Sequence, residues 1–268
     1  LLQFCFYKLN IAMPNNLIFN GPQKLVNNYL KMFKKSKNVS FNDFKFENSY
    51  ILQFDEFGEN ILKKLKKRNK NSKVFVGPLF SQENLKTLLS YKNKIPNLKI
   101  VVVSKSVKDN LLKLDEKLES KDILVFPVGI FDFEKKLKVP FKRTEECLIY
   151  FKKRKEEELS LIKNLLEQKN ITYQVFEYNN YKNKDLIKQA KNSKFGIVLN
   201  KTESQGIAIQ EMLGCNLPLL VCDYSENKLW GEKYIGTSVP YWSEECGIKI
   251  NNLNDLDSSI DIFLKKIE

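Results

Sequence analysis

The sequence of 268 residues contains no histidine. Histidine is the usual general acid or base near neutral pH and the commonest protein ligand of metal ions. Its absence excludes a Ser-His-Asp triad, a Cys-His nucleophile pair, a His-ligated metal site and a histidine general base. No other property of the composition excludes as many kinds of active site.

Cysteine is scarce too, and no two cysteines form a C-x-x-C pair. The odd number and wide spacing argue against a disulfide framework or a zinc site. Three of the cysteines adjoin apolar runs, where cysteine packs as a small hydrophobic residue. We expect reduced packing residues and a cytoplasmic protein; the cysteines are Cys5, Cys147, Cys215, Cys222 and Cys246.

Long apolar runs are also missing. Hydrophobic residues make up 43% of the chain and charged residues 29%, which is close to the globular average. No stretch approaches the roughly 20 apolar residues that a membrane span requires. The apolar start, residues 1–7, is short and has no basic segment before it, so we do not expect a signal peptide.

Basic residues are in excess, with 45 Lys and Arg against 32 Asp and Glu, a net charge of +13. Such a balance favours polyanionic partners: nucleic acid, an anionic membrane surface or phosphorylated substrates. The lysines are spread over nearly every predicted helix, for example Lys63, Lys113 and Lys188. Because they form no cluster in the sequence, we do not expect nucleic-acid binding.

Short β-rich apolar runs alternate with longer amphipathic segments along the whole chain, which is typical of βαβ units around a parallel sheet. At about 150 residues per domain the length indicates roughly two domains. In the first half we predict strands over residues 9–13, 50–54, 73–76, 98–103 and 123–127, with 39–46 as a candidate for one more, and helices over 22–35, 56–67, 82–91 and 107–114.

The alternation is interrupted over residues 133–146 by a polar, lysine-rich and proline-containing segment. We place the domain boundary there, giving domains over residues 1–134 and 135–268. In the second half we predict strands over 147–151, 172–176, 195–199 and 217–222, and helices over 156–168, 184–190 and 206–213. Within the first of these helices Leu159, Ile162, Leu165 and Leu166 fall on one face. The fold class is α/β, with two Rossmann-like doubly wound domains and a cleft between them.

One segment of the second half presents two acids around a helix start. A strand ends at Asn200, a loop carries Glu203, a helix opens near Gly206 and carries Glu211, and Pro218 leads to the next strand. Free backbone N–H groups and the positive dipole end of a helix suit a phosphate. A carboxylate nearby can accept hydrogen bonds from vicinal hydroxyls. Spacing alone is also compatible with ordinary surface charges.

This segment resembles the donor-binding motif of retaining GT-B glycosyltransferases, in particular glycosyltransferase family 4. The shared pattern is two glutamates separated by seven residues, a small-residue turn after the first and a Gly-x-Pro-like entry to the next strand. Fainter similarities follow in the family's order: the turn Asn20-Gly21-Pro22, Val103-Ser104, and Pro127 to Asp132, which is similar to an interdomain P-x-G-I-D segment with one residue inserted. The family's N-domain histidine is missing.

The resemblance implies the roles of the site residues. Glu203 would orient the donor sugar and Glu211 the ribose, while Lys152 and Arg154, in the basic segment after the first strand of the second domain, would hold the diphosphate. The turn residues implied for donor binding are Gln205, Gly206 and Ile207 around the helix start, and Gly21 in the N-terminal turn.

The resemblance therefore implies a metal-independent glycosyltransferase that moves a sugar, with retention, from a nucleotide-diphosphate-sugar donor to a hydroxyl acceptor. No cofactor besides the co-substrate is expected; the acceptor, whether glycan, lipid-linked or protein, stays open. One alternative is a GT-B-like module that binds a nucleotide sugar or glycan without transfer, and a second is a basic nucleic-acid-binding α/β protein. The basic surface is also compatible with peripheral contact with an anionic membrane.

Overall fold

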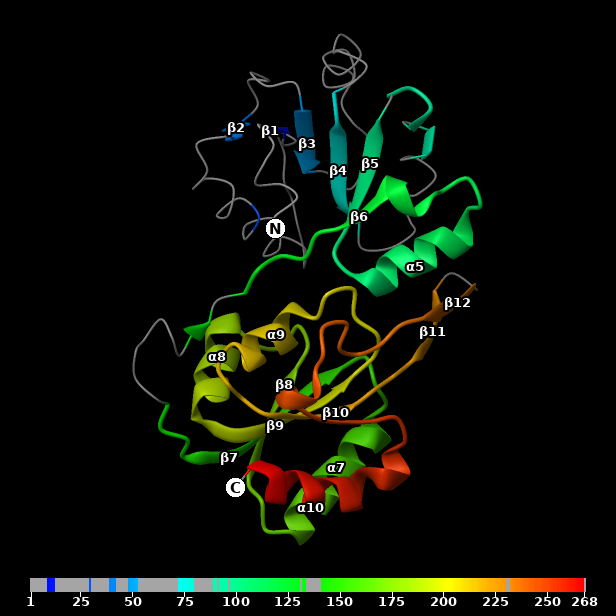
Figure 1. Ribbon diagram of the computed structural model, residues 1–268. Helices are drawn as coiled ribbons and strands as arrows, with labels where there is room; N and C mark the ends of the chain where they lie inside the picture. The colour runs from blue at the N-terminus through cyan, green and yellow to red at the C-terminus, as the bar shows by residue number, and fades with distance from the viewer. Residues whose placement is uncertain are drawn as a thin grey trace. The chain divides into compact units, whose positions relative to one another are not determined.

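The computed structural model describes residues 9–12, 29, 39–41, 48–52, 72–79, 89–90, 92–95, 97–130, 132–133, 141–229 and 232–267 (Figure 1). The chain divides into two compact units, Leu1–Gly129 and Ile130–Glu268. The boundary predicted after residue 134 lies outside the described residues. So do Gly21 with its turn, the predicted helices over 22–35 and 56–67 apart from Tyr29, and most of the helix predicted over 82–91.

The first unit contains a six-stranded parallel sheet in the order β2-β1-β3-β4-β5-β6. All six residues of β4 are buried, and so is nearly all of β5, because a parallel strand is covered on both faces. The strands are β1 (Leu9–Ala12), β2 (Val39–Phe41), β3 (Asn48–Leu52), β4 (Val74–Leu79), β5 (Leu98–Val102) and β6 (Ile123–Val125).

One helix of the first unit, α5 (Lys105–Leu114), follows β5. It begins where the Ser104 hydroxyl accepts a hydrogen bond from the Val107 N–H, at 3.4 Å. Its buried residues Val107, Asn110 and Leu111 recur at helical spacing. The helix predicted over residues 107–114 is confirmed, with two more residues at its start.

The second unit contains a five-stranded parallel sheet in the order β13-β10-β9-β7-β8. The strands are β7 (Glu145–Lys152), β8 (Tyr173–Glu177), β9 (Ser193–Asn200), β10 (Leu219–Cys222) and β13 (Gly247–Ile250). The helices are α7 (Glu156–Gln168), α8 (Asn183–Asn192), α9 (Ile207–Leu213) and α10 (Leu256–Ile267). An antiparallel pair, β11 (Glu226–Leu229) and β12 (Glu232–Ile235), lies outside this sheet.

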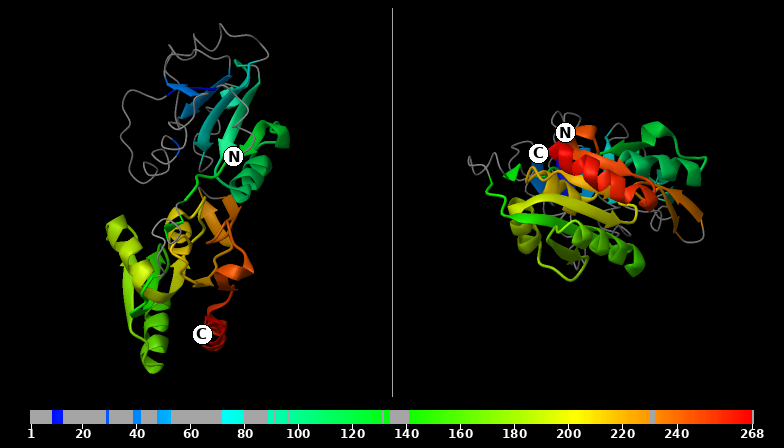
Figure 2. Two further views of the ribbon diagram at one scale, coloured as in Figure 1. Left: turned by 60° about the vertical axis from the view of Figure 1, so that its left-hand side comes forward. Right: turned by 90° about the horizontal axis from the view of Figure 1, so that it is seen from below.

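Helices cover both faces of this second sheet, so the unit has three layers (Figures 1 and 2). Helices α7 and α10 pack on one face, where Ile162 and Phe263 are fully buried against β7 and β9. Helices α8 and α9 pack on the other, where Leu186 and Met212 are fully buried. The predicted inward face of α7 is confirmed, since Leu159, Ile162 and Leu166 are buried and Leu165 packs against the same core.

Arg143 joins two segments of the second unit near the amino ends of β9 and β10. Its guanidinium donates to the carbonyl oxygens of Ala190 and Ser193 around the end of α8, at 3.2 and 2.6 Å. It also donates to the carbonyl oxygens of Cys215 and Asn216 beyond α9, at 2.8 and 2.9 Å. One side chain thus satisfies carbonyl groups that two helix ends leave without intrahelical partners.

The predicted elements of the second unit are present with shifted ends. The strand predicted from residue 217 begins only at Leu219, because the Leu217 N–H still donates to the carbonyl of Met212, at 3.2 Å, beyond the end of α9. Asn216 there has a φ of 51°, a conformation that asparagine tolerates better than most residues. No element was predicted after residue 222, where β11, β12, β13 and α10 lie.

Candidate active site at the carboxyl ends of two adjacent strands

The order of the second sheet reverses at its first strand. The chain passes from β7 to β8 on one side, returns across β7 to β9 on the other side and continues to β10. In open α/β sheets ligands bind at such a reversal, beyond the carboxyl ends of the two strands. Here the register places Lys152, the last residue of β7, opposite Asn200, the last residue of β9.

A three-residue cluster occupies this place: Lys152, Asn200 and Glu203. The Lys152 ammonium donates to Oε1 of Glu203 at 2.7 Å, and the Asn200 amide donates to the same oxygen at 3.1 Å. The Lys152 and Glu203 side chains are only 17% and 13% exposed. The Lys152 ammonium also lies over the Tyr178 ring, 4.4 Å from its centroid. The structure therefore brings together two of the predicted site residues, Lys152 and Glu203.

The loop that carries Glu203 is fixed at both ends. The Glu203 N–H donates to the carbonyl of Thr237 at 2.9 Å, and Lys201 N–H donates to the carbonyl of Lys152 at 3.2 Å. At the start of α9 Gly206 has φ 74° and ψ 51°, a left-handed conformation that favours glycine. A Cβ there would come no closer than 3.5 Å to Ile209, so another residue would be opposed by its backbone conformation and not by crowding.

Arg154 lies next to Asn200 of this cluster, and its hydrogen bonds go to other groups of the protein. Its side chain is 5% exposed and makes a two-pronged ion pair with Glu158, four residues further on. The guanidinium also donates to the carbonyls of Asn200 and Cys222, at 3.4 and 3.2 Å. The hydrogen bond from Arg154 lowers the pKa of Glu158. Arg154 thus connects the ends of β9 and β10 with the start of α7.

A second carboxylate, Asp223, directly follows β10 and is surrounded by donors. It accepts hydrogen bonds from the Ser238 N–H at 2.6 Å, from the Thr237 hydroxyl at 2.9 Å and from the Tyr224 N–H at 2.9 Å. Lys249 completes the group at 3.1 Å. Burial would raise the pKa of Asp223, but these hydrogen bonds outweigh burial and hold the pKa below its ordinary value.

Glu211, the second predicted acid, is buried in α9. Its charge acts on Tyr181, whose pKa is raised first by burial and further by Glu211. The Tyr181 ring is in edge contact with that of Tyr150, with centroids 6.2 Å apart. Tyr150 is buried in β7, and its pKa is raised, mainly by burial and also by nearby Glu203.

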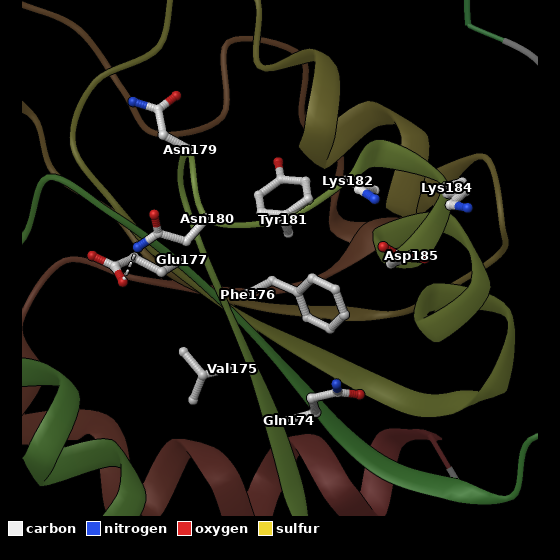
Figure 3. A pocket seen from close by; sticks show the side chains of 10 residues that line it. All are labelled: Gln174, Val175, Phe176, Glu177, Asn179, Asn180, Tyr181, Lys182, Lys184 and Asp185. Atoms are coloured by element: carbon white, nitrogen blue, oxygen red, sulfur yellow. Dashed lines mark hydrogen bonds between the residues drawn. The ribbon is translucent and has the colours of Figure 1, made fainter.

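Tyr181 also lines a cavity of about 950 Å³ at the end of β8 and the start of α8. Figure 3 shows Tyr181 near the centre of this pocket, with Phe176 below it and polar side chains around it. The two rings are in edge contact, with centroids 5.7 Å apart. The lining residues are Gln174, Val175, Phe176, Glu177, Asn179, Asn180, Tyr181, Lys182, Lys184 and Asp185.

The remaining predicted residues are placed as follows. Gln205 is buried and donates to the Gln210 side chain at 3.0 Å. Ile207 is the first residue of α9, so its N–H lies in the turn that has no intrahelical acceptor. Gly21 lies outside the described residues. No role was predicted for Asn200, although its position at the end of a strand opposite Lys152 is the signal that could have revealed one.

None of the helices in the described ranges combines the length and the apolar character that a membrane span requires. The same residues contain no group of three or more Cys, Asp or Glu side chains arranged to hold a metal ion.

Neither a protein-family model nor a curated protein matches the sequence. Solved structures do match. One is a chain of the GtfA/B complex, with a TM-score of 0.48, 14% identity and 95% of this chain covered; this chain spans only 55% of that one. Another is the lipopolysaccharide outer core galactosyltransferase WaaB in its apo form, with a TM-score of 0.58, 8% identity, and 97% and 91% of the two chains covered. The predicted Rossmann-like α/β class is confirmed, and the likeness to WaaB is one of fold, the GT-B fold.

Proposed function

We propose that this protein is a glycosyltransferase that uses a nucleotide-diphosphate-sugar donor, with the donor bound at the carboxyl ends of β7 and β9. The observation that carries the proposal is the position of the Lys152–Glu203 pair at the strand-order reversal of a GT-B fold. A cation and a carboxylate side by side suit a ligand in which an anionic diphosphate adjoins a hydroxyl-bearing sugar.

In this proposal Glu203 orients the donor sugar. Its Oε1 is held by Lys152 and Asn200, whereas Oε2 has no hydrogen-bond partner within the part of the chain that the structure describes. An ionised carboxylate oxygen is a strong acceptor for sugar hydroxyls. Lys152 neutralises the diphosphate as it leaves, which stabilises the charge that develops in the transition state.

The nucleoside lies beside Glu211 and Tyr181, where the cavity of Figure 3 opens. Glu211 accepts hydrogen bonds from the ribose hydroxyls, and the N–H groups at Gly206 and Ile207 face the phosphate. Arg154 is assigned a different role from the predicted one. Since it is buried against Glu158 and two strand-end carbonyls, we propose that it positions the site and does not contact the diphosphate.

The transfer itself needs no histidine. The bond between the anomeric carbon and the phosphate oxygen breaks, and the acceptor oxygen attacks from the face on which the phosphate departs. The acceptor proton passes to the departing phosphate oxygen and leaves with the nucleoside diphosphate. This course retains the anomeric configuration and uses the leaving group as the base. The acceptor presents a hydroxyl group and is a glycan, a lipid-linked molecule or a protein.

The test is a thermal-shift screen of the whole chain against UDP, GDP, ADP and CMP and their common sugar derivatives. A ligand that binds only the folded state at about 100 times its Kd stabilises the protein by about 2.7 kcal/mol. For a chain of this size that raises the melting temperature by about 5 °C. Stabilisation by one nucleotide and its sugar is expected.

Two variants identify the site. Glu203→Gln should abolish the extra stabilisation that the sugar gives. Glu211→Gln should weaken the binding of both the nucleotide and the nucleotide sugar. The matched control is Glu146→Gln, because Glu146 pairs with Lys194 across the same strands, β7 and β9, at their other ends. Binding without sugar transfer to any acceptor would favour the non-catalytic module. Stabilisation by none of the ligands would contradict the proposal.

A further inference from the structure

Asn200 is a polar residue in an apolar strand. The preceding residues of β9, Ile197, Val198 and Leu199, are fully buried, and Asn200 is as completely buried as they are. Its amide nitrogen donates to Glu203, but its Oδ1 is buried without a hydrogen-bond partner in the described part of the chain. A buried oxygen without a partner costs free energy that an apolar side chain would avoid. Packing therefore gives no reason for an asparagine here.

The amide donor gives a reason. A neutral side chain of this length that donates a hydrogen bond also carries an oxygen atom. The buried, unpartnered Oδ1 is therefore a consequence of having an amide donor at this position. That donor meets the same oxygen of Glu203 that Lys152 contacts. In the free protein Oε1 thus has two partners, one charged and one neutral.

A bound donor changes this balance. The diphosphate carries more negative charge than one carboxylate, and the lysine ammonium on its flexible stem can turn toward it. Glu203, which is 13% exposed, would then lose its cation, and a poorly hydrated carboxylate without a partner is costly. Asn200 cannot turn in the same way, because its short side chain is fully buried.

We infer that Asn200 is a positioning residue that keeps Glu203 paired and directed at the donor sugar when the diphosphate takes over Lys152. This inference rests on the proposed function. It predicts that the Asn200 amide matters little while Lys152 is available to Glu203 and matters strongly once Lys152 is engaged elsewhere.

The first test needs no ligand. Asn200→Leu is introduced into the wild-type chain and into a Lys152→Met chain, and the melting temperatures of all four proteins are compared. Because Asn200 is the remaining partner of Glu203 in the Lys152→Met chain, the loss on Asn200→Leu should be larger there than in the wild type. Equal losses in the two backgrounds overturn the inference. Asn200→Ala, which removes the donor without adding a charge, gives the same comparison if the leucine variant does not fold.

The second test uses UDP with UDP-glucose, then GDP with GDP-mannose, in titration calorimetry of the whole chain. Asn200→Leu should lower the affinity for the nucleotide sugar about tenfold and change the affinity for the nucleoside diphosphate less than twofold. The control is Ser238→Ala, which removes the hydrogen bond to the Asn200 carbonyl and leaves the amide in place. It should show no such split.

The outcomes separate the two proposals. If neither pair binds the wild-type chain, the proposed function has failed for these donors, while the comparison of melting temperatures still decides whether the amide acts as the second partner of Glu203. If the nucleotide sugar binds and Asn200→Leu weakens both ligands equally or neither, the donor site stands and the positioning role is overturned. A split of the same size in Ser238→Ala also overturns it.

Discussion

Two carboxylates follow neighbouring strands of the second sheet and differ in how many of their oxygens accept hydrogen bonds. Asp223, after β10, accepts hydrogen bonds on both oxygens, from two backbone N–H groups, a hydroxyl and a lysine. Glu203, after β9, accepts from the described residues on Oε1 alone. A carboxylate saturated by protein donors serves the fold, whereas a half-used one in a cluster with a lysine retains capacity for a ligand. Adjacent strand ends can therefore have separate tasks.

Replacing Asp223 should have the largest effect on stability. In Asp223→Ala the donors of Thr237, Ser238 and Lys249 lose their common acceptor, and we expect a loss of about 3 kcal/mol in the free energy of unfolding. Urea denaturation followed by circular dichroism measures it. A loss no greater than that caused by Glu203→Ala would remove the distinction between the two carboxylates.

Arg154 contacts the ends of the two strands that these carboxylates follow. Its replacement should therefore have the second largest effect on stability. Arg154→Met keeps the apolar stem but removes one donor from each of the carbonyls of Asn200 and Cys222 and removes the ion-pair partner of Glu158. We expect a loss of about 2 kcal/mol in the free energy of unfolding. The pKa of Glu158 should rise toward its ordinary value, which carboxyl NMR titration detects. An unchanged pKa would contradict the assigned contact.

Acid should act on Asp223 with a smaller effect. Because its pKa is lower in the folded than in the unfolded chain, its contribution to stability is complete above the unfolded value of about 4 and is lost as the pH falls through the folded pKa. The difference in unfolding free energy between the wild type and Asp223→Asn should therefore shrink as the pH is lowered from 6 to 2. A constant difference over that range would refute this assignment.

The smallest stability change is expected for Glu203→Gln. An amide oxygen can still accept from Lys152 and Asn200, and the site is partly open to water, so the loss should be about 1 kcal/mol or less. The same variant should lose the sugar-dependent thermal shift. Melting temperatures with and without nucleotide sugar give both values. A large loss of stability without ligand would place Glu203 with Asp223 among the residues that serve the fold.

Most of the second unit could be predicted from its sequence up to residue 222, because each apolar run there is bounded by polar residues. Helix α7 was predicted with its exact limits, 156–168. The last part was missed because β11 and β12 pair locally and their sequences contain no apolar run of the kind that marks the other strands. Helix α10 could have been predicted, since Leu256, Ile260 and Phe263, which are buried, recur at helical spacing.

The site could be predicted only in part. The two glutamates and Lys152 could be nominated from the sequence, because their types and spacing carry a chemical meaning. The partner of Glu203, Asn200, was not found, since the pairing depends on β9 lying beside β7 in a given register. Arg154 illustrates another limit. Its place after a strand predicts a phosphate contact, which stays a prediction, whereas its contacts with three separate segments cannot be read from a linear pattern.

The central position of β7 has a consequence for synthesis on the ribosome. Its edge toward β9 stays unpaired until Asn200 has been added, which at about 5–20 residues per second takes roughly 2 to 10 seconds after Lys152. During that interval β7 has β8 as its neighbour and no cover for its other edge. A nascent chain that stops there carries the lysine of the candidate site without its glutamate. The site is therefore assembled only when roughly half of the second unit has been synthesised.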